Sequence, residues 1–302
     1  MKAIVLHEYG GPDKLKYEDV DDPVPQAGEV LVHLSATSVN PVDYKLRSGA
    51  LKEFMSLQFP AILGHDIAGI VRSLGMGVTR FKEGDRVMAL GGRSYAEFAV
   101  VKESDLALIP ENLDLTDAAA LPLVTLTGQQ LITRGVRPQA GQTLLVAGAV
   151  GGVGRTAVYT AKQLGATVIA GVRKRQLEAA EKLGADEVLA LDDERAVEKL
   201  GFLDAVADCV GHETAEMLIG KVKQGGIFAS VLGAPANANL HPTVRVESVQ
   251  VISDAAGLRK LAEDVAARRF TVPIDRILPL SDAAKAQEAA EKGGLGKVLL
   301  SP

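Results

Sequence analysis

From about residue 116 the chain alternates short buried-type strands with helical stretches. Apolar runs such as TLLVAGA (143–149), TVIAGV (167–172) and GIFASVL (226–232) are separated by segments with helical periodicity, among them GRTAVYTAKQLG (154–165). Because parallel strands need long crossover connections, strand–helix–strand units repeated in this way predict a doubly wound parallel sheet with right-handed crossovers. In the first helix one apolar face is expected, formed by Val153, Ala157, Ala161 and Leu164.

The first third of the chain has a different pattern. EVLVHLSATSV (29–39), DIAGIVRSLG (66–75) and GDRVMAL (84–90) are short, partly alternating and rich in β-branched residues, as in strands of a β-rich domain. The segment after residue 253 returns to a mixed α+β pattern. A length of 302 residues favours two domains.

Composition excludes several classes of function. There are 38 acidic and 33 basic residues, only 4% aromatic residues and no Trp, so nothing indicates a nucleic-acid partner. The single cysteine, Cys209, excludes an intrachain disulfide and fits a reducing cytoplasm. The apolar run in MKAIVLHEYG is too short for a signal peptide, and no uninterrupted apolar stretch is long enough to span a membrane. We therefore expect a cytoplasmic protein without membrane contact.

The glycine cluster in LLVAGAVGGVG (144–154) closes a predicted strand and opens a predicted helix. In this context it indicates a dinucleotide site, since glycines let the backbone approach a pyrophosphate and the helix N-terminus attracts the phosphates. Ala149 stands where the first glycine of the usual fingerprint would be. The alternative is a tight strand-to-helix turn without a ligand. The candidate cofactor residues here are Gly148, Gly151, Gly152, Val153 and Gly154.

The next strand predicts which dinucleotide is bound. After Gly171 it continues into Arg173, Lys174 and Arg175, where an NAD enzyme would place an acid for the ribose hydroxyls. Guanidinium groups bind a 2′-phosphate, whereas a carboxylate would repel it. Three cations at a helix start are unfavourable without an anion, although a solvated basic helix start is the alternative. The pattern favours NADPH over NADH.

Several motifs together resemble a known family. GHDIAG, GDRV, AGAVGGVG, KLGAD and GKVLL resemble, in the same order, the medium-chain dehydrogenase/reductase superfamily. NPVDYKLRSG (40–49) and LPLVTLTG (121–128) are similar to its zinc-free quinone and enone oxidoreductase branch. The resemblance implies an α/β protein: a GroES-like β-rich catalytic domain (1–115 and 254–302), a Rossmann domain (116–253) and an active site in the cleft between them. It also implies a homodimer joined through edge strands near 249–253.

The chain departs from the zinc enzymes of this superfamily. His65 and Asp66 stand at the zinc-ligand motif, but no cysteine lies near them, and a tetrahedral catalytic site needs three protein ligands. The cysteine-rich structural zinc lobe is also missing. We therefore expect no metal and interpret His65 as a packed or hydrogen-bonded residue.

The resemblance also assigns residues around the substrate and the nicotinamide. Lys45, expected in a loop, aligns with the lysine of the NPVDxK motif, which contacts substrate and cofactor; a surface lysine is the alternative. Tyr44 is adjacent and can donate a proton, while Asn40 is expected to hold the loop. The positions that flank the nicotinamide in the family correspond to Thr127, Val231, Leu232 and Gly233.

These features predict an NADPH-dependent reductase of α,β-unsaturated carbonyls or quinones. The sequence does not separate enone reduction from quinone reduction, or one-electron from two-electron transfer. An NADPH-binding structural or sensor protein with little turnover is the alternative from another class. A zinc-dependent alcohol dehydrogenase is disfavoured by the ligand count.

Overall fold

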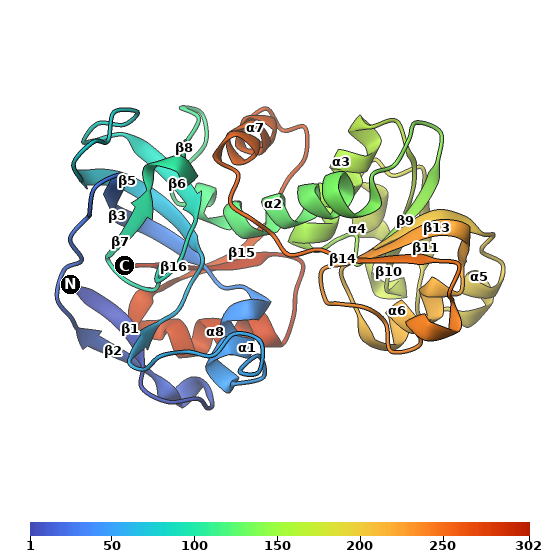
Figure 1. Cartoon of the computed structure of the whole chain (residues 1–302), viewed down its shortest axis with the longest axis horizontal. Helices are drawn as coiled ribbons and strands as arrows, with labels where there is room; N and C mark the ends of the chain where they lie inside the picture. Colours follow the sequence, from blue (N-terminus) through green and yellow to red (C-terminus); the bar gives the residue numbers. More distant parts are fainter. The chain divides into compact units, whose positions relative to one another are not determined.

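Two units make up the chain in the computed structural model, which describes residues 1–302. One consists of Met1–Leu123 and Ser253–Pro302, the other of Val124–Ile252 (Figure 1). The segment 116–123, which the sequence analysis assigns to the Rossmann domain, packs within the first unit. Its 3-10 helix, Asp117–Ala120, has three buried alanines and contacts strands of that unit. The sequence pattern therefore changes near residue 116, a few residues before the second unit begins at Val124.

The second unit is built on a six-stranded parallel sheet. Its strands lie in the order β11-β10-β9-β12-β13-β14, and all of its neighbouring pairs are parallel. This is the 3-2-1-4-5-6 order of a doubly wound dinucleotide fold. The strands are β9 (Thr143–Ala147), β10 (Thr167–Val172), β11 (Glu187–Ala190), β12 (Leu203–Asp208), β13 (Val222–Ser230) and β14 (Arg245–Ser248).

Helices cover both faces of this sheet, because alternate residues of each strand point to opposite sides. Leu144 and Val146 of β9 pack into one apolar core, and Leu145 and Ala147 into another. Residues of α3 contribute to the first core and residues of α6 to the second. The helices of the unit are α2 (Pro122–Gln130, which begins in the first unit), a π-helix (Leu131–Val136), α3 (Gly152–Gln163), α4 (Leu177–Glu181), α5 (Glu194–Glu198) and α6 (His212–Ile219).

The predicted apolar face of α3 is correct in its middle and wrong at its end. Ala157 and Ala161 are fully buried, and Val153 is partly buried. Leu164 is 43% exposed, because the helix ends at Gln163 and the following residues turn into β10.

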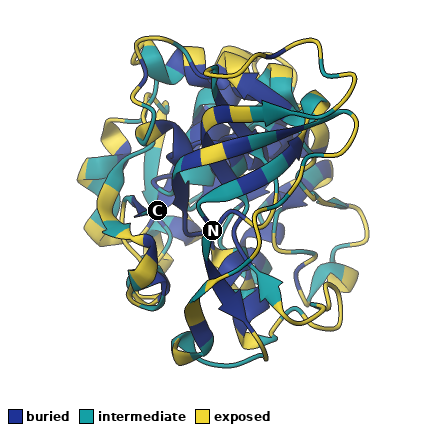
Figure 2. Ribbon diagram, turned by 90° about the vertical axis from the view of Figure 1, so that its left-hand side faces the viewer, coloured by how far each residue is buried: buried dark blue, intermediate teal, exposed yellow.

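The first unit holds a seven-stranded sheet and a three-stranded sheet. The larger sheet has the order β15-β16-β3-β5-β6-β8, with β7 paired to β3, and the smaller has the order β2-β1-β4. Figure 2 shows buried and exposed residues side by side in this unit. Burial alternates along β3 and β7, as in strands with one buried face, whereas β1, β6 and β16 are buried over most of their length. The strands are β1 (Lys2–Leu6), β2 (Leu15–Asp19), β3 (Glu29–Ser38), β4 (Ala61–Ile62), β5 (Asp66–Leu74), β6 (Arg86–Leu90), β7 (Phe98–Lys102), β8 (Leu106–Leu108), β15 (Ile274–Pro279) and β16 (Lys297–Ser301); the helices are α1 (Pro41–Ser48), α7 (Ala255–Ala266) and α8 (Ala283–Glu291).

The predicted edge strand at 249–253 is wrong by a few residues. The edge strand β14 ends at Ser248; Val249 N–H still donates to the Ser230 carbonyl of β13 at 2.9 Å, and the residues after it are held by side chains. Gln130 Nε2 donates to the Ile252 carbonyl at 2.7 Å, and Ile252 N–H donates to Gln130 Oε1 at 3.0 Å. The homodimer stays a prediction. No helix has the length and apolar character needed to cross a bilayer.

Candidate active site

The glycine turn lies between β9 and α3, at the carboxyl edge of the parallel sheet. Gly148 has φ +75°, a conformation that favours glycine, and its N–H donates to the Gly171 carbonyl at 2.9 Å. Because Gly148 supplies the left-handed residue, the fingerprint position can be occupied by Ala149, which is fully buried. β9 lies between β10 and β12 at the point where the strand order reverses, the usual ligand position in doubly wound sheets.

Gly154 allows the first turn of α3 to pack closely on the turn before it. A Cβ at this position would lie 2.2 Å from the Gly148 carbonyl oxygen and 2.7 Å from Ala149 Cα. Gly151 caps the helix, so the N–H groups of the following residues, from Gly152 to Gly154, have no partner within the helix. They form a ready site for the phosphates of a dinucleotide.

Helix α2 contacts this same turn and brings Thr127 beside it. A Cβ at Gly128 would lie 2.3 Å from the Val153 carbonyl oxygen, so only glycine allows α2 to approach α3 this closely. Thr127 Oγ1 is buried and has no hydrogen-bond partner. Unpaired buried hydroxyl groups are costly in proteins, and a polar group of a bound ligand would satisfy this one. The residues present therefore fit a dinucleotide cofactor.

Three cations follow β10 at the same edge of the sheet. Arg173, Lys174 and Arg175 are exposed, and their side chains make no hydrogen bond or ion pair within the protein. They lie at the start of a helical stretch, as the sequence predicts: Arg173 precedes the 3-10 helix Lys174–Gln176, and α4 follows it. Gly171 is buried, and a Cβ there would lie 3.0 Å from the side chain of Leu145, so its small size serves the packing of the sheet.

A buried carboxylate shapes the neighbouring strand ends. Asp208, the last residue of β12, accepts hydrogen bonds from the N–H groups of Val210 and Gly211 and from Ser230 Oγ at 2.7 Å. Ser230 Oγ in turn accepts from Leu232 N–H at 3.0 Å, which fixes the turn after β13. The predicted nicotinamide-flanking residues Val231, Leu232 and Gly233 form this turn, and Gly233 has φ +99°. Asp208 is not among the predicted site residues, although it directly precedes Cys209 at the end of a predicted strand.

Lys45 and Tyr44 of the first unit lie on a helix, not in the expected loop. The stretch NPVDYKLRSG carries helix signals: Pro41 opens α1 and Gly49 ends it with φ +79°. Lys45 is partly exposed, and its amine makes no hydrogen bond or ion pair. Tyr44 is partly buried; burial, together with the negative charges of Glu291 and Asp43, raises the pKa of its hydroxyl. It is therefore protonated and able to donate at neutral pH.

Asn40 holds the start of a helix, α1, and not of the expected loop, through a buried network. Its side-chain amide donates to Asp66 Oδ2 at 2.7 Å, and its Oδ1 accepts from Lys297 Nζ at 2.5 Å. Lys297 also donates to the Val39 carbonyl at 3.0 Å and lies 3.8 Å from Asp66. Asn40 is 0% exposed, so it positions the helix, and no part of it is open to a substrate.

Asp66 links this network to the start of α2. Its second oxygen, Oδ1, accepts a hydrogen bond from Leu123 N–H at 2.7 Å. Burial lowers the pKa of the Lys297 amine more than the negative charges of Asp66 and Asp43 raise it. Lys297 is not among the predicted site residues either; its only signal is a single lysine before the apolar run of the final strand.

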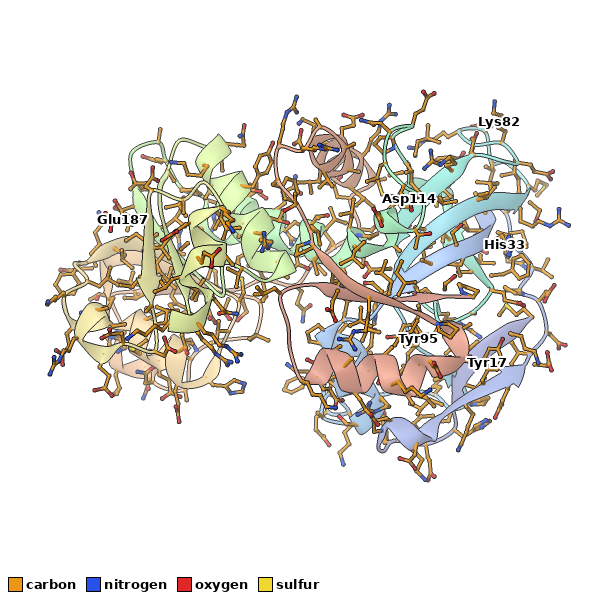
Figure 3. The ribbon with its side chains drawn as sticks, turned by 180° about the vertical axis from the view of Figure 1, so that it is seen from behind. Tyr17, His33, Lys82, Tyr95, Asp114 and Glu187 are labelled. Atoms are coloured by element: carbon orange, nitrogen blue, oxygen red, sulfur yellow. The ribbon has the colours of Figure 1, made fainter.

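His65 forms a hydrogen-bonded pair with Asp43, as the sequence analysis expects. His65 Nδ1 lies 2.7 Å from Asp43 Oδ1, and the hydroxyl of Tyr95 donates to Asp43 Oδ2 at 3.1 Å. Tyr95, labelled in Figure 3, is fully buried in the first unit. Burial opposes protonation of His65, but the hydrogen bond and charge of Asp43 outweigh it, so its pKa is raised.

The residues around His65 do not fit a zinc ion. No group of three or more His, Cys, Asp or Glu side chains is arranged to hold a metal. The only cysteine, Cys209, belongs to the second unit, and burial raises the pKa of its thiol.

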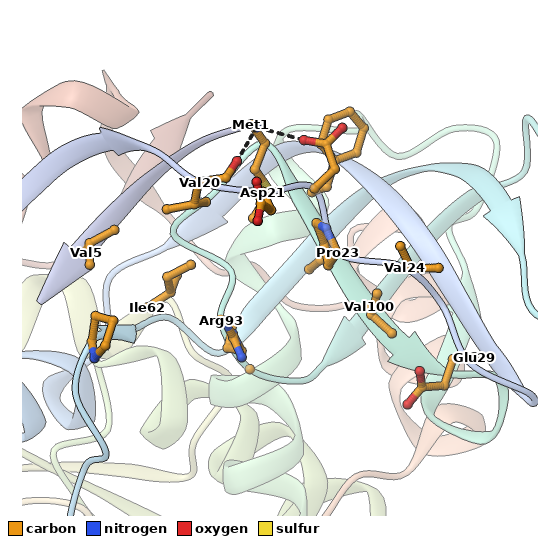
Figure 4. Close-up of a pocket in the computed structure, with 15 residues that line it drawn as sticks. Met1, Val5, Val20, Asp21, Pro23, Val24, Glu29, Ile62, Arg93 and Val100 are labelled. Carbon is orange, nitrogen blue, oxygen red and sulfur yellow. Dashed lines mark hydrogen bonds and ion pairs between the residues drawn. The ribbon is translucent and has the colours of Figure 1, made fainter.

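One cavity lies in the first unit, and none of the predicted site residues lines it. It has a volume of about 540 Å³, and Figure 4 shows it between the start of the chain and β7. Its lining is mainly aliphatic, with Arg93 and a few acidic side chains.

Comparison with known proteins agrees with this arrangement. Residues 26–111 match the alcohol dehydrogenase GroES-like domain, and residues 183–300 match the zinc-binding dehydrogenase family. The chloroplast envelope quinone oxidoreductase homolog of Arabidopsis thaliana is 32% identical over 330 residues, covering 100% of this chain and 98% of the relative. The NADPH-dependent alkenal/one oxidoreductase of the same plant is 35% identical over 247 residues, 78% of this chain and 63% of that protein.

Solved structures show the same architecture over the whole chain. The quinone oxidoreductase of Coxiella burnetii superposes with a TM-score of 0.90 and 29% identity, covering 100% of this chain and 99% of that one. The Escherichia coli quinone oxidoreductase complexed with NADPH superposes with a TM-score of 0.89 and 28% identity, covering 100% of both chains.

The chain belongs to the medium-chain dehydrogenase/reductase superfamily, with a GroES-like domain and a Rossmann-type dinucleotide-binding domain. Within that superfamily its homologues include quinone oxidoreductases and alkenal/enone reductases, and it is an oxidoreductase.

Proposed function

We propose that this protein transfers hydride from NADPH to the conjugated double bond of α,β-unsaturated carbonyl compounds or to quinones, without zinc. The observation that carries the proposal is the set of three exposed, unpaired cations, Arg173 to Arg175, beside the glycine turn. A 2′-phosphate is the group that distinguishes NADPH from NADH, and guanidinium groups bind phosphate in bidentate fashion.

The second unit would hold the cofactor through its main chain and small side chains. The free N–H groups at the start of α3 bind the phosphates, and Arg173 with its neighbours binds the 2′-phosphate. The hydroxyl of Thr127, which has no hydrogen-bond partner in the protein, and the turn 231–233 orient the nicotinamide. When bound, NADPH supplies the hydride.

Lys45 and Tyr44 provide the polar groups for the substrate. Hydride addition to a conjugated acceptor produces an enolate or a quinol anion, in which the charge is delocalised and a few donors can stabilise it. Lys45 is a permanent cation with no partner in the protein, and the Tyr44 hydroxyl stays protonated at neutral pH. We assign Lys45 to charge stabilisation and Tyr44 to orientation or proton donation.

Zinc independence rests on the ligand set. His65 is committed to Asp43, and no thiolate is available in the first unit. A saturated ketone would form a full alkoxide, which usually needs a metal or a strong acid. This ligand set therefore favours conjugated acceptors over simple ketones.

The test is an NADPH-oxidation assay over short enals, cyclic enones, benzoquinones, naphthoquinones and simple aldehydes, with elemental analysis of the same untagged protein. We expect turnover with enones or quinones, little with simple aldehydes, and no stoichiometric zinc. Binding of NADPH without turnover of any acceptor would favour a structural or sensor protein instead. About one zinc per chain, lost together with activity on chelation, would contradict zinc independence.

A further inference from the structure

Arg155 lies at the glycine turn and has no role in the site described so far. It directly follows Gly154, in the first turn of α3, and is partly buried. Its Nε donates to the Val150 carbonyl at 2.7 Å. This bond directs the guanidinium back over the turn 148–151 instead of outward along the helix.

The position is unfavourable for a cation in the protein alone. Burial lowers the pKa of Arg155, and no acidic side chain lies near enough to form an ion pair with it. The N-terminal end of a helix also carries partial positive charge, which repels a cation. Burial and the helix N-terminus therefore both disfavour the charge on Arg155, and no acidic side chain of the protein compensates for them.

The buried arginine of the first unit provides the contrast. Arg47 donates to Gln287 Oε1 and to Glu291 Oε1, both at 2.7 Å, and to the Gly10 carbonyl. Its guanidinium is paired on every side, as expected of a buried charge. Arg155 has one carbonyl partner on Nε, and its two terminal nitrogens have none in the protein.

We propose that Arg155 binds the diphosphate of the dinucleotide. The inference rests on the proposed function and adds to it a cofactor-binding side chain. The diphosphate would lie at the N-terminus of α3, where Gly152, Val153 and Gly154 present free N–H groups, and the guanidinium would supply the remaining charge. Since NADPH and NADH share the diphosphate, Arg155 contributes equally to both, unlike Arg173.

Equilibrium titration of the full-length protein with NADPH and with NADH, followed by cofactor fluorescence, tests this division. Arg155→Gln removes the charge and keeps an amide that can donate to Val150, while Arg155→Lys keeps the charge. We expect Arg155→Gln to raise the Kd of both cofactors by the same factor, about tenfold or more, and Arg155→Lys to raise them less. The matched variant Arg173→Gln should raise the Kd of NADPH alone.

Thermal unfolding without cofactor separates a ligand contact from a structural role. Because the charge is unfavourable in the empty protein, Arg155→Gln should leave the Tm unchanged or raise it, while reducing the Tm shift that NADPH causes. A lowered Tm without cofactor, together with unchanged Kd values, would overturn the inference in favour of a purely structural arginine. Equal weakening of both cofactors would support it even if no enone or quinone is reduced, in which case only the proposed activity fails.

Discussion

The glycine turn of the second unit and the start of α1 in the first unit use their polar groups in opposite ways. In the second unit the glycine turn uses main-chain N–H groups, small residues and a single half-buried cation, Arg155. In the first unit the start of α1 is held by three buried, ionisable side chains, Asp43, Asp66 and Lys297. The first arrangement leaves polar groups free for a ligand, whereas the second uses its polar groups to fix a helix.

Because of this difference, we expect substitutions at the glycine turn of the second unit to change cofactor affinity and substitutions in the buried network of the first unit to change the free energy of unfolding. Groups that await a ligand contribute little to the folded state without it, so changes at the glycine turn and its cations should act mainly on binding. Groups that satisfy one another in the interior become costly when one partner is removed.

Lys297→Met should cause the largest loss of stability. It removes the cation that donates to Asn40 and lies 3.8 Å from Asp66, and it leaves a buried carboxylate without its charge partner. Breaking a buried pair in this way costs roughly 3–5 kcal/mol. Urea unfolding should show this loss, and Lys297→Met combined with Asp66→Asn should recover part of it. A loss below about 1 kcal/mol would place the pair among weak surface-type interactions.

Lys45→Met should have the next largest effect, on rate instead of stability. The amine has no partner in the protein, so its removal should change the unfolding free energy little. Loss of a preorganised donor to developing negative charge costs about 2.7–4 kcal/mol, or 10²–10³ in kcat. Steady-state kinetics on the best enone or quinone measure this.

Tyr44→Phe is the matched variant and should lower kcat less. A normal kcat for Lys45→Met with an inactive Tyr44→Phe would mean that the roles of the two neighbours are reversed. Normal rates for both variants would show that neither residue stabilises the negative charge that develops on the substrate.

Gly154→Ala tests the close approach of α3 to the glycine turn. The added Cβ would overlap the Gly148 carbonyl oxygen, so the turn must shift, at a cost of about 1–3 kcal/mol. We expect weaker binding of NADPH and a lower Tm. Gly201→Ala is the control, since nothing lies within 4 Å of its added methyl group. Equal behaviour of the two variants would contradict a role for the close approach.

The sequence predicts the second unit better than the first because its signals are local. The glycine turn and the basic residues after β10 each depend on neighbours within a few positions. By contrast, Lys297 contacts Asn40 across 257 positions, and no pattern in one sequence reveals that pairing. One of the two misplacements was avoidable: Pro41 and Gly49 are helix-boundary signals, so Lys45 could have been placed on a helix. The structure of segment 249–253 could not be predicted in this way, because the segment is held by the side chain of Gln130, which lies in helix α2.

The pair of His65 and Asp43 should give a smaller, pH-dependent effect. Because the pKa of His65 is raised in the folded protein, its stabilisation is fully present below the unfolded value of about 6.5 and is lost as pH rises through the folded value. Unfolding free energies measured at about pH 6 and about pH 9 should differ less in His65→Asn than in the unmodified protein. An identical pH dependence in both would show that His65 titrates alike in the folded and unfolded states.

The preference for NADPH depends on the proposed binding of its 2′-phosphate by the cations after β10. The most direct measurement is the ratio of the Kd values of NADH and NADPH for the unmodified protein and for Arg173→Asp, by fluorescence titration. One or two charge-assisted contacts of roughly 1.5–3 kcal/mol each predict a ratio on the order of ten to a thousand or more. Arg173→Asp, which places a carboxylate there, should erode or invert it. Equal Kd values for the two cofactors in the unmodified protein would contradict the account.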